Sequence, residues 1–221
     1  MSENSTVETE PRQSDSPRRR YLKKNPLGSV SKQAANESSG RIILISGPPG
    51  AGKSTVAKEL ASSSAVPTVY IEGDTFWHFI VKNGTPNHPA KPRKAMSRIV
   101  IKSMMLAALP YARGGYEVIV DFSIGPWFLD LFQDYLKETP LEYVILCPSE
   151  RVCARRAASR KDGAMPDYSQ YHELHEAFSN LGDFEKYAIR DDVESPAELA
   201  ATITRLICSG ACRLVTNREQ V

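Results

Sequence analysis

The chain has 221 residues, of which 41% are hydrophobic and 24% are charged. These values are near the average for globular proteins and give no sign of collagen or of a largely disordered chain, and the length suits one α/β domain with a tail. Residues 1–39 hold seven Lys and Arg and five Asp and Glu, which leaves 21 residues of each sign in residues 40–221. A domain with balanced charge lacks the broad positive excess of nucleic-acid-binding proteins, so we expect no nucleic-acid partner.

The sequence contains no run of about 18 apolar residues, the length needed to cross a bilayer, and its amino terminus begins with polar and acidic residues. We therefore expect a cytoplasmic protein that does not bind a membrane. The four cysteines form no CxxC pair and have no His at metal-site spacing, which predicts reduced thiols used in packing rather than zinc ligands. They are Cys147, Cys153, Cys208 and Cys212.

Residues 1–39 are rich in Ser, Asn, Glu, Pro and basic residues and show no apolar periodicity. Such a segment cannot bury enough apolar surface to offset the entropy lost on ordering, so we predict a flexible tail followed by one domain over residues 40–221. The basic cluster at residues 18–24 is interpreted as solvated charge, with contact to an acidic partner as the alternative.

From residue 41, short apolar runs alternate with helical segments, the pattern of βαβ units around a parallel sheet. The predicted strands are residues 41–46, 68–71, 116–121, 141–147 and 184–189. The predicted helices are residues 55–62, 94–113, 149–160 and 171–181, with a loop at 161–170. A last helix is expected after Ser195, because Ser195, Pro196 and Glu198 form the pattern of an N-cap, a first-turn proline and a capping box.

The segment between the first strand and the first helix reads Gly-Pro-Pro-Gly-Ala-Gly-Lys-Ser at residues 47–54 and matches the complete P-loop pattern. Its glycines let successive N–H groups point at phosphate oxygens, at the positive end of the following helix. Lys53 suits the outer phosphates and Ser54 suits Mg²⁺. The alternative, a glycine-rich turn that fits by chance, requires both glycines, the Lys, the Ser, the strand and the helix to coincide. We therefore predict nucleotide contacts from Gly47, Pro48, Pro49, Gly50, Ala51, Gly52, Lys53, Ser54 and Thr55.

Two acidic residues follow neighbouring strands. Asp74 comes just after the second strand, where a carboxylate can hold or deprotonate an acceptor hydroxyl; the alternative is that it only caps a helix. Asp121 ends the third strand, where an acidic group holds Mg²⁺ directly or through water; the alternative is a turn residue. The sequence leaves open which of the two is the base.

Two arginines on the predicted helix 149–160 are further candidates. Arg156 and Arg160 are spaced i, i+4, which puts them on one helical face. They are expected to neutralise the transferring phosphoryl group, or else to lie on a solvated face with salt bridges. Aromatic groups flank both acids and either wall an acceptor pocket or belong to the core. They are Phe76, Trp77, Phe79, Trp127 and Phe128, with His78 interpreted as structural.

These motifs resemble the P-loop small-molecule kinases, which include shikimate kinase, gluconate kinase, chloramphenicol phosphotransferase and the zeta-toxin-like kinases. The resemblance covers about residues 40–207 and is carried by residues 47–55, Gly73-Asp74, residues 118–121 with 125–128, and residues 147–153 leading into Arg156 and Arg160. It implies a P-loop NTPase fold with three αβα layers, a five-stranded parallel sheet and a helical lid that carries the two arginines. It also implies Asp74 as base or acceptor ligand, and ATP and Mg²⁺ as cofactors. Residues 81–92 resemble the acceptor-side region, where members differ most.

The expected function is an ATP- and Mg²⁺-dependent transfer of the γ-phosphate to a hydroxyl of a small molecule, with Lys53, Asp74, Arg156 and Arg160 catalytic and Ser54 and Asp121 at the metal. One alternative is an ATP-hydrolysing regulatory module that acts on a macromolecular partner. Another is a nucleic-acid 5′-hydroxyl kinase, against which the balanced charge argues. The sequence has no Asn-Lys-x-Asp guanine reader, which disfavours a GTP switch. It indicates neither the acceptor nor an oligomeric state.

Overall fold

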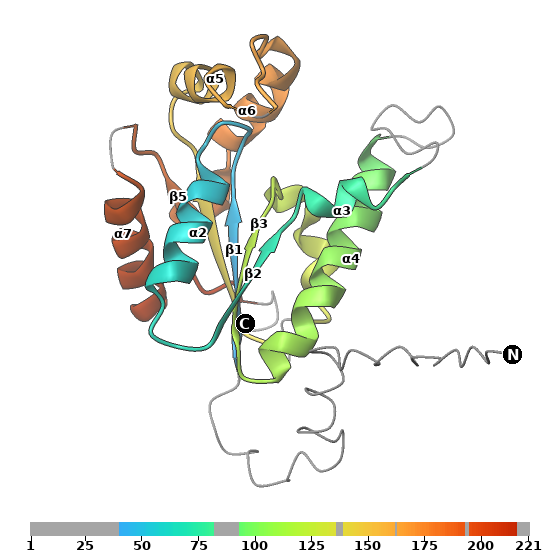
Figure 1. Ribbon diagram of the computed structural model, residues 1–221, viewed down its shortest axis with the longest axis vertical. Helices are drawn as coiled ribbons and strands as arrows, with labels where there is room; N and C mark the ends of the chain where they lie inside the picture. The colour runs from blue at the N-terminus through green and yellow to red at the C-terminus, as the bar shows by residue number, and fades with distance from the viewer. Residues whose placement is uncertain (1–39, 82–92, 136–138, 162, 193–194, 216–221) are drawn as a thin grey trace, which may run out of the picture. The chain divides into compact units, whose positions relative to one another are not determined.

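The computed structural model describes residues 40–81, 93–135, 139–161, 163–192 and 195–215 (Figure 1). The predicted tail and all but the first residue of the acceptor-side segment 81–92 lie outside these ranges. Five strands form one sheet in the order β2-β3-β1-β4-β5, and every pair is parallel. The predicted five-stranded parallel sheet is therefore confirmed. The strands are β1 (Arg41–Ser46), β2 (Thr68–Glu72), β3 (Glu117–Asp121), β4 (Leu141–Leu146) and β5 (Ala188–Ile189).

Helices cover both faces of this sheet and give the three layers expected. Figure 1 shows α2 and α7 on one side and α4 on the other, while α5 and α6 lie beyond the carboxyl ends of the strands. The helices are α2 (Lys53–Ser63), α3 (Thr75–His78), α4 (Arg93–Arg113), α5 (Glu150–Ala158), α6 (His172–Ser179) and α7 (Pro196–Cys208). The 3₁₀ segments are η2 (Pro126–Phe132), η3 (Ser169–Tyr171) and η4 (Gly182–Tyr187).

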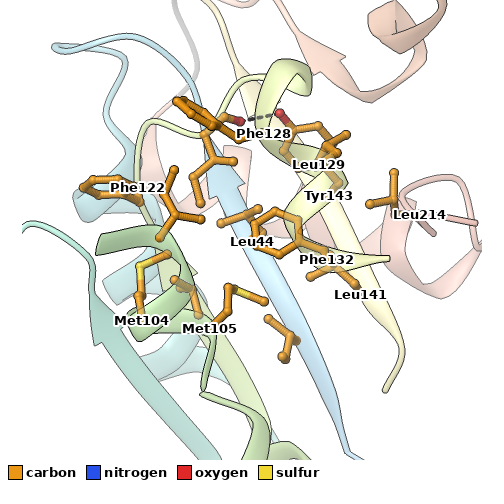
Figure 2. Close-up of a cluster of buried hydrophobic side chains, with 14 of the residues drawn as sticks. Leu44, Met104, Met105, Phe122, Phe128, Leu129, Phe132, Leu141, Tyr143 and Leu214 are labelled. Atoms are coloured by element: carbon orange, nitrogen blue, oxygen red, sulfur yellow. Dashed lines mark hydrogen bonds between the residues drawn. The ribbon is translucent and has the colours of Figure 1, made fainter. Parts of the chain in front are cut away.

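The central strand β1 contributes to a core on each face. Ile42 and Leu44 pack with α4 and η2, where Met104, Met105 and Phe132 surround them (Figure 2). Ile43 and Ile45 pack on the opposite face under α2 and α7, with Val56, Ala57 and Ile203 among their neighbours. Because both faces are buried, β1 is a continuous apolar run rather than an alternating one, as is usual in parallel sheets.

The ends of two long helices follow local sequence signals. The capping box of α7 is present: the Glu198 N–H donates to Ser195 Oγ over 3.3 Å, and the Ser195 N–H donates to Glu198 Oε2 over 3.0 Å. At the end of α4, Gly115 has a φ of 90° and Tyr116 N–H donates to Tyr111 O over 3.1 Å. This Schellman closure needs the left-handed glycine and sends the chain directly into β3.

Three predicted elements are wrong in part: the strand 184–189 and the helices 149–160 and 171–181, of which the last ends at Ser179. Only Ala188–Ile189 of the expected strand 184–189 is extended, since Gly182–Tyr187 forms a 3₁₀ helix. The reason is the spacing of the apolar residues: Leu181, Phe184 and Tyr187 lie three apart and face the core together, which matches a 3₁₀ period and not a strand. The expected helix 149–160 ends at Ala158, with the Ser159 N–H bonded to Arg155 O.

The four cysteines are free, and three of them, Cys147, Cys153 and Cys212, are buried while Cys208 is exposed. Burial raises the pKa of Cys153 and of Cys212 to about 11, so both thiols stay protonated at neutral pH. The interpretation of these cysteines as mostly packing residues is confirmed.

The segment after α7 is attached to the sheet by a charged pair. Glu142 in β4 is fully buried, and its Oε1 accepts from the guanidinium of Arg213 over 2.8 Å. Glu142 and Arg213 also form an isolated antiparallel bridge, and Leu214 N–H donates to Leu141 O over 2.9 Å. The carboxylate is thus paired from one side only, because its Oε2 has no partner among the described residues.

We predict that Arg213→Ala lowers the free energy of unfolding by about 2–4 kcal/mol, because it leaves the buried Glu142 carboxylate without a cation. The expected loss is smaller than is usual for breaking a fully buried ion pair, because the Arg213 side chain is 43% exposed. Urea denaturation followed by circular dichroism measures the change. Arg205→Ala, on the exposed face of α7, is the matched control and should change stability by less than about 0.5 kcal/mol.

The double variant Arg213→Ala with Glu142→Gln should recover part of the lost stability, because the amide removes the uncompensated charge. A double variant no more stable than Arg213→Ala alone would show that the charge of Glu142 is not the cause.

Candidate active site

The P-loop joins the carboxyl end of β1 to the first turn of α2. Gly47, Gly50 and Gly52 have φ angles of 134°, 79° and 95°, a region that side chains other than glycine rarely adopt. A Cβ on Gly47 would lie 2.0 Å from Leu146 O, and one on Gly50 would lie 2.1 Å from Cys153 O. The loop is therefore packed tightly against the end of β4 and against α5. Of the other loop residues, Pro48 and Ala51 are buried and Thr55 is exposed.

Two hydroxyl groups hold the loop backbone from either side. Tyr168, which is buried between α5 and η3, donates to Pro49 O over 2.7 Å, and Ser123 donates to Gly47 O over 2.8 Å. Neither residue belongs to the P-loop motif, and neither was predicted as a site residue. Their positions depend on which loops meet at the carboxyl edge, so the sequence carries no local signal for them.

Lys53 is the first residue of α2, and its Nζ donates to Pro48 O over 3.0 Å. Desolvation lowers the pKa of this ammonium to about 8; the carboxylates of Asp74 and Asp121 act in the opposite direction, and Arg160 lowers the pKa further. The charges of Asp74, Asp121 and Arg160 thus all act on Lys53. The structure brings Lys53, Asp74, Asp121 and Arg160 together from four different elements or loops.

Asp121 ends β3 and is 4% exposed. Its Oδ2 accepts a hydrogen bond from Ser54 Oγ, and its Oδ1 accepts from the hydroxyl of Tyr70 over 3.2 Å. A serine hydroxyl beside a carboxylate is a pair of hard oxygen donors of the kind that Mg²⁺ prefers. Ser54 and Asp121 therefore fit the metal role expected of them.

Asp74 is exposed and stands at the N-cap position of α3, yet its side chain makes no capping hydrogen bond. Gly73 before it donates its N–H to Asp121 O over 2.9 Å, and a Cβ there would lie 2.6 Å from the same oxygen. The glycine lets the chain pass close to β3, which brings Asp74 to the same edge as Asp121. The alternative that Asp74 only caps a helix finds no support in its contacts.

The two arginines differ in their placement. Arg156 lies in α5, where its Nη2 donates to Asp192 O over 3.3 Å and its Nη1 is 4.0 Å from where a Cβ of Gly52 would be. Arg160 is exposed and lies beyond the end of α5, so the expectation that both project from one helical face is wrong. Helix α5 stops at Ala158, before the turn that would align them. Arg160 still lies near enough to Lys53 to lower its pKa.

The aromatic residues near the two acids divide into two groups. Phe128 is buried, and Phe76 and Trp77 pack partly buried against the core, as in the packing alternative. Phe79 is 67% exposed and Trp127 is 37% exposed, with the Trp127 ring centroid 5.3 Å from that of Phe178 in α6. His78 is exposed in the last turn of α3 rather than packed in the core.

The sequence matches a known protein family. A family model described as an AAA domain matches residues 42–177, which is more than half of the chain and includes the P-loop, Asp74, Asp121, Arg156 and Arg160. The chain belongs to this family. No match was found among curated sequences.

Solved structures share the fold of this AAA domain. The tunicamycin resistance protein of Deinococcus radiodurans superposes with a TM-score of 0.56 at 18% identity, covering 80% of this chain and 99% of that one. Shikimate kinase from Acinetobacter baumannii gives a TM-score of 0.51 at 20% identity, covering 80% and 97%. A chain of an RNA repair complex gives 0.54 at 15% identity, covering 75% and 53%. These likenesses confirm the predicted P-loop NTPase fold.

Within the ranges that the structure describes, no helix is both long enough and apolar enough to cross a bilayer.

We predict that the affinity of the AAA domain for ATP falls as the pH rises above about 8, because phosphates bind the charged form of Lys53 and its pKa in the free protein is about 8. Below about pH 7 the ammonium is already fully charged, and Lys53 adds no pH dependence there. Above pH 8, binding requires uptake of a proton and the affinity should fall by up to about tenfold per pH unit. Titration of a fluorescent ATP analogue between roughly pH 6.5 and 9.5 measures this slope.

Lys53→Met should bind more weakly and lose the slope, whereas Lys102→Met, on the exposed side of α4, should retain it. Equal affinity of the unsubstituted protein at both ends of the pH range would contradict the assignment of Lys53 to the phosphates.

Proposed function

We propose that the protein is an ATP- and Mg²⁺-dependent phosphotransferase that moves the γ-phosphate to a hydroxyl group of a small molecule. The observation that carries the proposal is geometric: Gly73 N–H donates to Asp121 O, which brings Asp74 to the edge where Asp121 bonds Ser54 of the P-loop. The carboxylates of Asp74 and Asp121 both act on Lys53 there. A P-loop by itself is compatible with any NTPase. An additional exposed carboxylate beside it suits transfer to a hydroxyl, because the acceptor has to lose a proton.

The P-loop supplies the donor side of the reaction. Its N–H groups and the amino end of α2 provide partial positive charge for the phosphates, and Lys53 adds a full charge that phosphate binding favours. Tight packing against Leu146 and Cys153 fixes the loop before the nucleotide arrives. A preformed cradle loses little conformational entropy on binding.

Ser54 and Asp121 are the residues that would hold Mg²⁺. When bound, the metal would neutralise charge on the outer phosphates. Both oxygens of Asp121 already have hydrogen-bond donors, Ser54 and Tyr70. This arrangement supports a holding role for Asp121 and leaves the role of base to Asp74.

Asp74 is the proposed general base. Its carboxylate is exposed, makes no capping bond and lies near Lys53. As the acceptor oxygen forms its bond to the γ-phosphorus, the bond from that phosphorus to the leaving ADP oxygen breaks. The hydroxyl proton passes to Asp74. Arg156, near Gly52, and Arg160, whose charge acts on Lys53, are proposed to stabilise the charge that develops on the phosphoryl oxygens.

A second candidate is a 5′-hydroxyl kinase of nucleic acids, which the fold shared with a chain of an RNA repair complex favours. It requires the same cradle, base and arginines and differs in the acceptor. The equal numbers of acidic and basic residues in residues 40–221 favour the small molecule, because a polyanionic acceptor is bound largely through Lys and Arg.

We predict that Asp74→Asn lowers the rate of phosphate transfer by about 10²–10⁴-fold, because it removes the proton acceptor, while the Kd for ATP changes little. Release of ADP in the presence of acceptor measures the rate, and a fluorescent ATP analogue measures binding. Glu72→Gln, at a neighbouring exposed carboxylate, is the matched control and should retain transfer. Full transfer by Asp74→Asn would contradict the assignment of the base.

The acceptor class is decided by a screen with radiolabelled ATP over sugars, sugar nucleotides, nucleosides, antibiotics and 5′-hydroxyl oligonucleotides. Label in a small molecule supports the proposal. Label in the oligonucleotide alone establishes the second candidate. ADP release without any labelled acceptor, increased by a macromolecule, would instead identify a regulatory ATPase.

A further inference from the structure

Tyr70 lies in β2, outside the P-loop motif, yet its hydroxyl reaches the proposed metal site. It donates to Asp121 Oδ1 over 3.2 Å, while Ser54 Oγ donates to Asp121 Oδ2. Strand β2 is the edge strand next to β3, so the contact crosses between neighbouring strands.

The parallel register explains why these groups meet. Tyr70 pairs with Ile119, and Asp121 lies two residues further along β3 and therefore on the same face of the sheet. That face packs under α2 and α7, where Ile119 is buried and Tyr70 lies partly buried. Ser54 is in the first turn of α2 above it. The three side chains thus come together from a strand, its neighbour and the covering helix.

Hydrogen-bond chemistry sets the direction of each contact. An ionised carboxylate only accepts, so the hydroxyls of Tyr70 and Ser54 must both donate to Asp121. A phenol has an ordinary pKa of about 10, so Tyr70 donates as a neutral hydroxyl at neutral pH. A Ser54 hydroxyl that donates to Asp121 has its lone pairs free to face a cation.

We propose that Tyr70 is a positioning residue for Mg²⁺: by holding Oδ1 of Asp121 it fixes the carboxylate so that Oδ2 keeps the Ser54 hydroxyl oriented toward the metal. This inference rests on the proposed function, since it assigns Mg²⁺ to Ser54 and Asp121. Without the phenol, the carboxylate can rotate, and Ser54 loses a fixed acceptor. Groups that orient metal ligands in this way typically change metal affinity by about 10–100-fold.

Tyr70→Phe isolates the hydroxyl from the ring. The ring packs against the core under α2, and Lys58 Nζ lies 5.8 Å from its centroid. Phenylalanine preserves this packing and the cation–π contact and removes one oxygen atom. Tyr111→Phe, on the exposed side of α4, is the matched control because it deletes the same atom away from the site.

The test is a Mg²⁺ titration of the full chain with a fluorescent ATP analogue, which requires no acceptor and no turnover. In Tyr70→Phe, the Mg²⁺ concentration that gives half of the increase in nucleotide affinity should rise by about tenfold. The nucleotide Kd in excess EDTA should not change, because the phosphates still meet the intact P-loop. Tyr111→Phe should match the unsubstituted protein in both measurements.

A double-variant cycle checks that Tyr70 acts through Asp121. Asp121→Asn should weaken the Mg²⁺ response more than Tyr70→Phe does, and adding Tyr70→Phe to it should cause no further change. Additive effects of the two substitutions would overturn the inference. A Tyr70→Phe variant that is less stable to urea but has an unchanged Mg²⁺ midpoint would also overturn it, since it would show a structural role only.

The outcome for the unsubstituted protein separates this inference from the proposed function. If Mg²⁺ strengthens nucleotide binding and Tyr70→Phe does not alter the midpoint, this inference fails and the proposed function stands. If Mg²⁺ has no effect on nucleotide binding by the unsubstituted protein, the metal dependence of the proposed function fails, and this inference fails with it.

Discussion

The parallel pairing of β1 with β3 and β4 is the constraint on which the site depends. Because neighbouring strands run in the same direction, their carboxyl ends meet at one edge, and each leads into a loop there. The P-loop follows β1, Asp121 ends β3, and the chain after β4 enters α5 with Arg156. Groups separated by more than a hundred residues in sequence become neighbours through this one geometric rule.

The site is held by hydroxyl groups that contact backbone or carboxylate oxygens. Ser46 donates to Ile124 O over 2.7 Å, Ser123 donates to Gly47 O, and Tyr168 donates to Pro49 O. The hydroxyl of Tyr143 also donates to Ile124 O (Figure 2). The bonds to Gly47 O and Pro49 O fix the P-loop, which otherwise depends on glycine for its shape. A cradle for a polyanion has to keep its N–H groups free, and these hydroxyls stabilise the loop through its carbonyl oxygens instead.

The groups around Lys53 act on its ammonium charge in opposite directions. Desolvation alone would make the Lys53 ammonium costly, and the carboxylates of Asp74 and Asp121 offset part of that cost, while Arg160 opposes them. Added phosphate would shift this balance toward the protonated lysine. The same carboxylates that stabilise the free lysine are those assigned to the acceptor and to the metal, so the free protein already has the charge arrangement that the proposed reaction requires.

The sequence by itself determined the elements with strong local signals: the buried runs of β1 and β4, the capping box at Ser195, and the P-loop with its glycines, since each depends on residues close together in the chain. It misjudged residues 184–189 and the end of α5, because short segments take their form from what they pack against. Only the tertiary structure decided that Tyr70 contacts Asp121, that Tyr168 holds Pro49 and that Arg160 acts on Lys53 from outside the helix. The strand order β2-β3-β1-β4-β5 brings these residues together. No local sequence pattern encodes which strands become neighbours in the sheet.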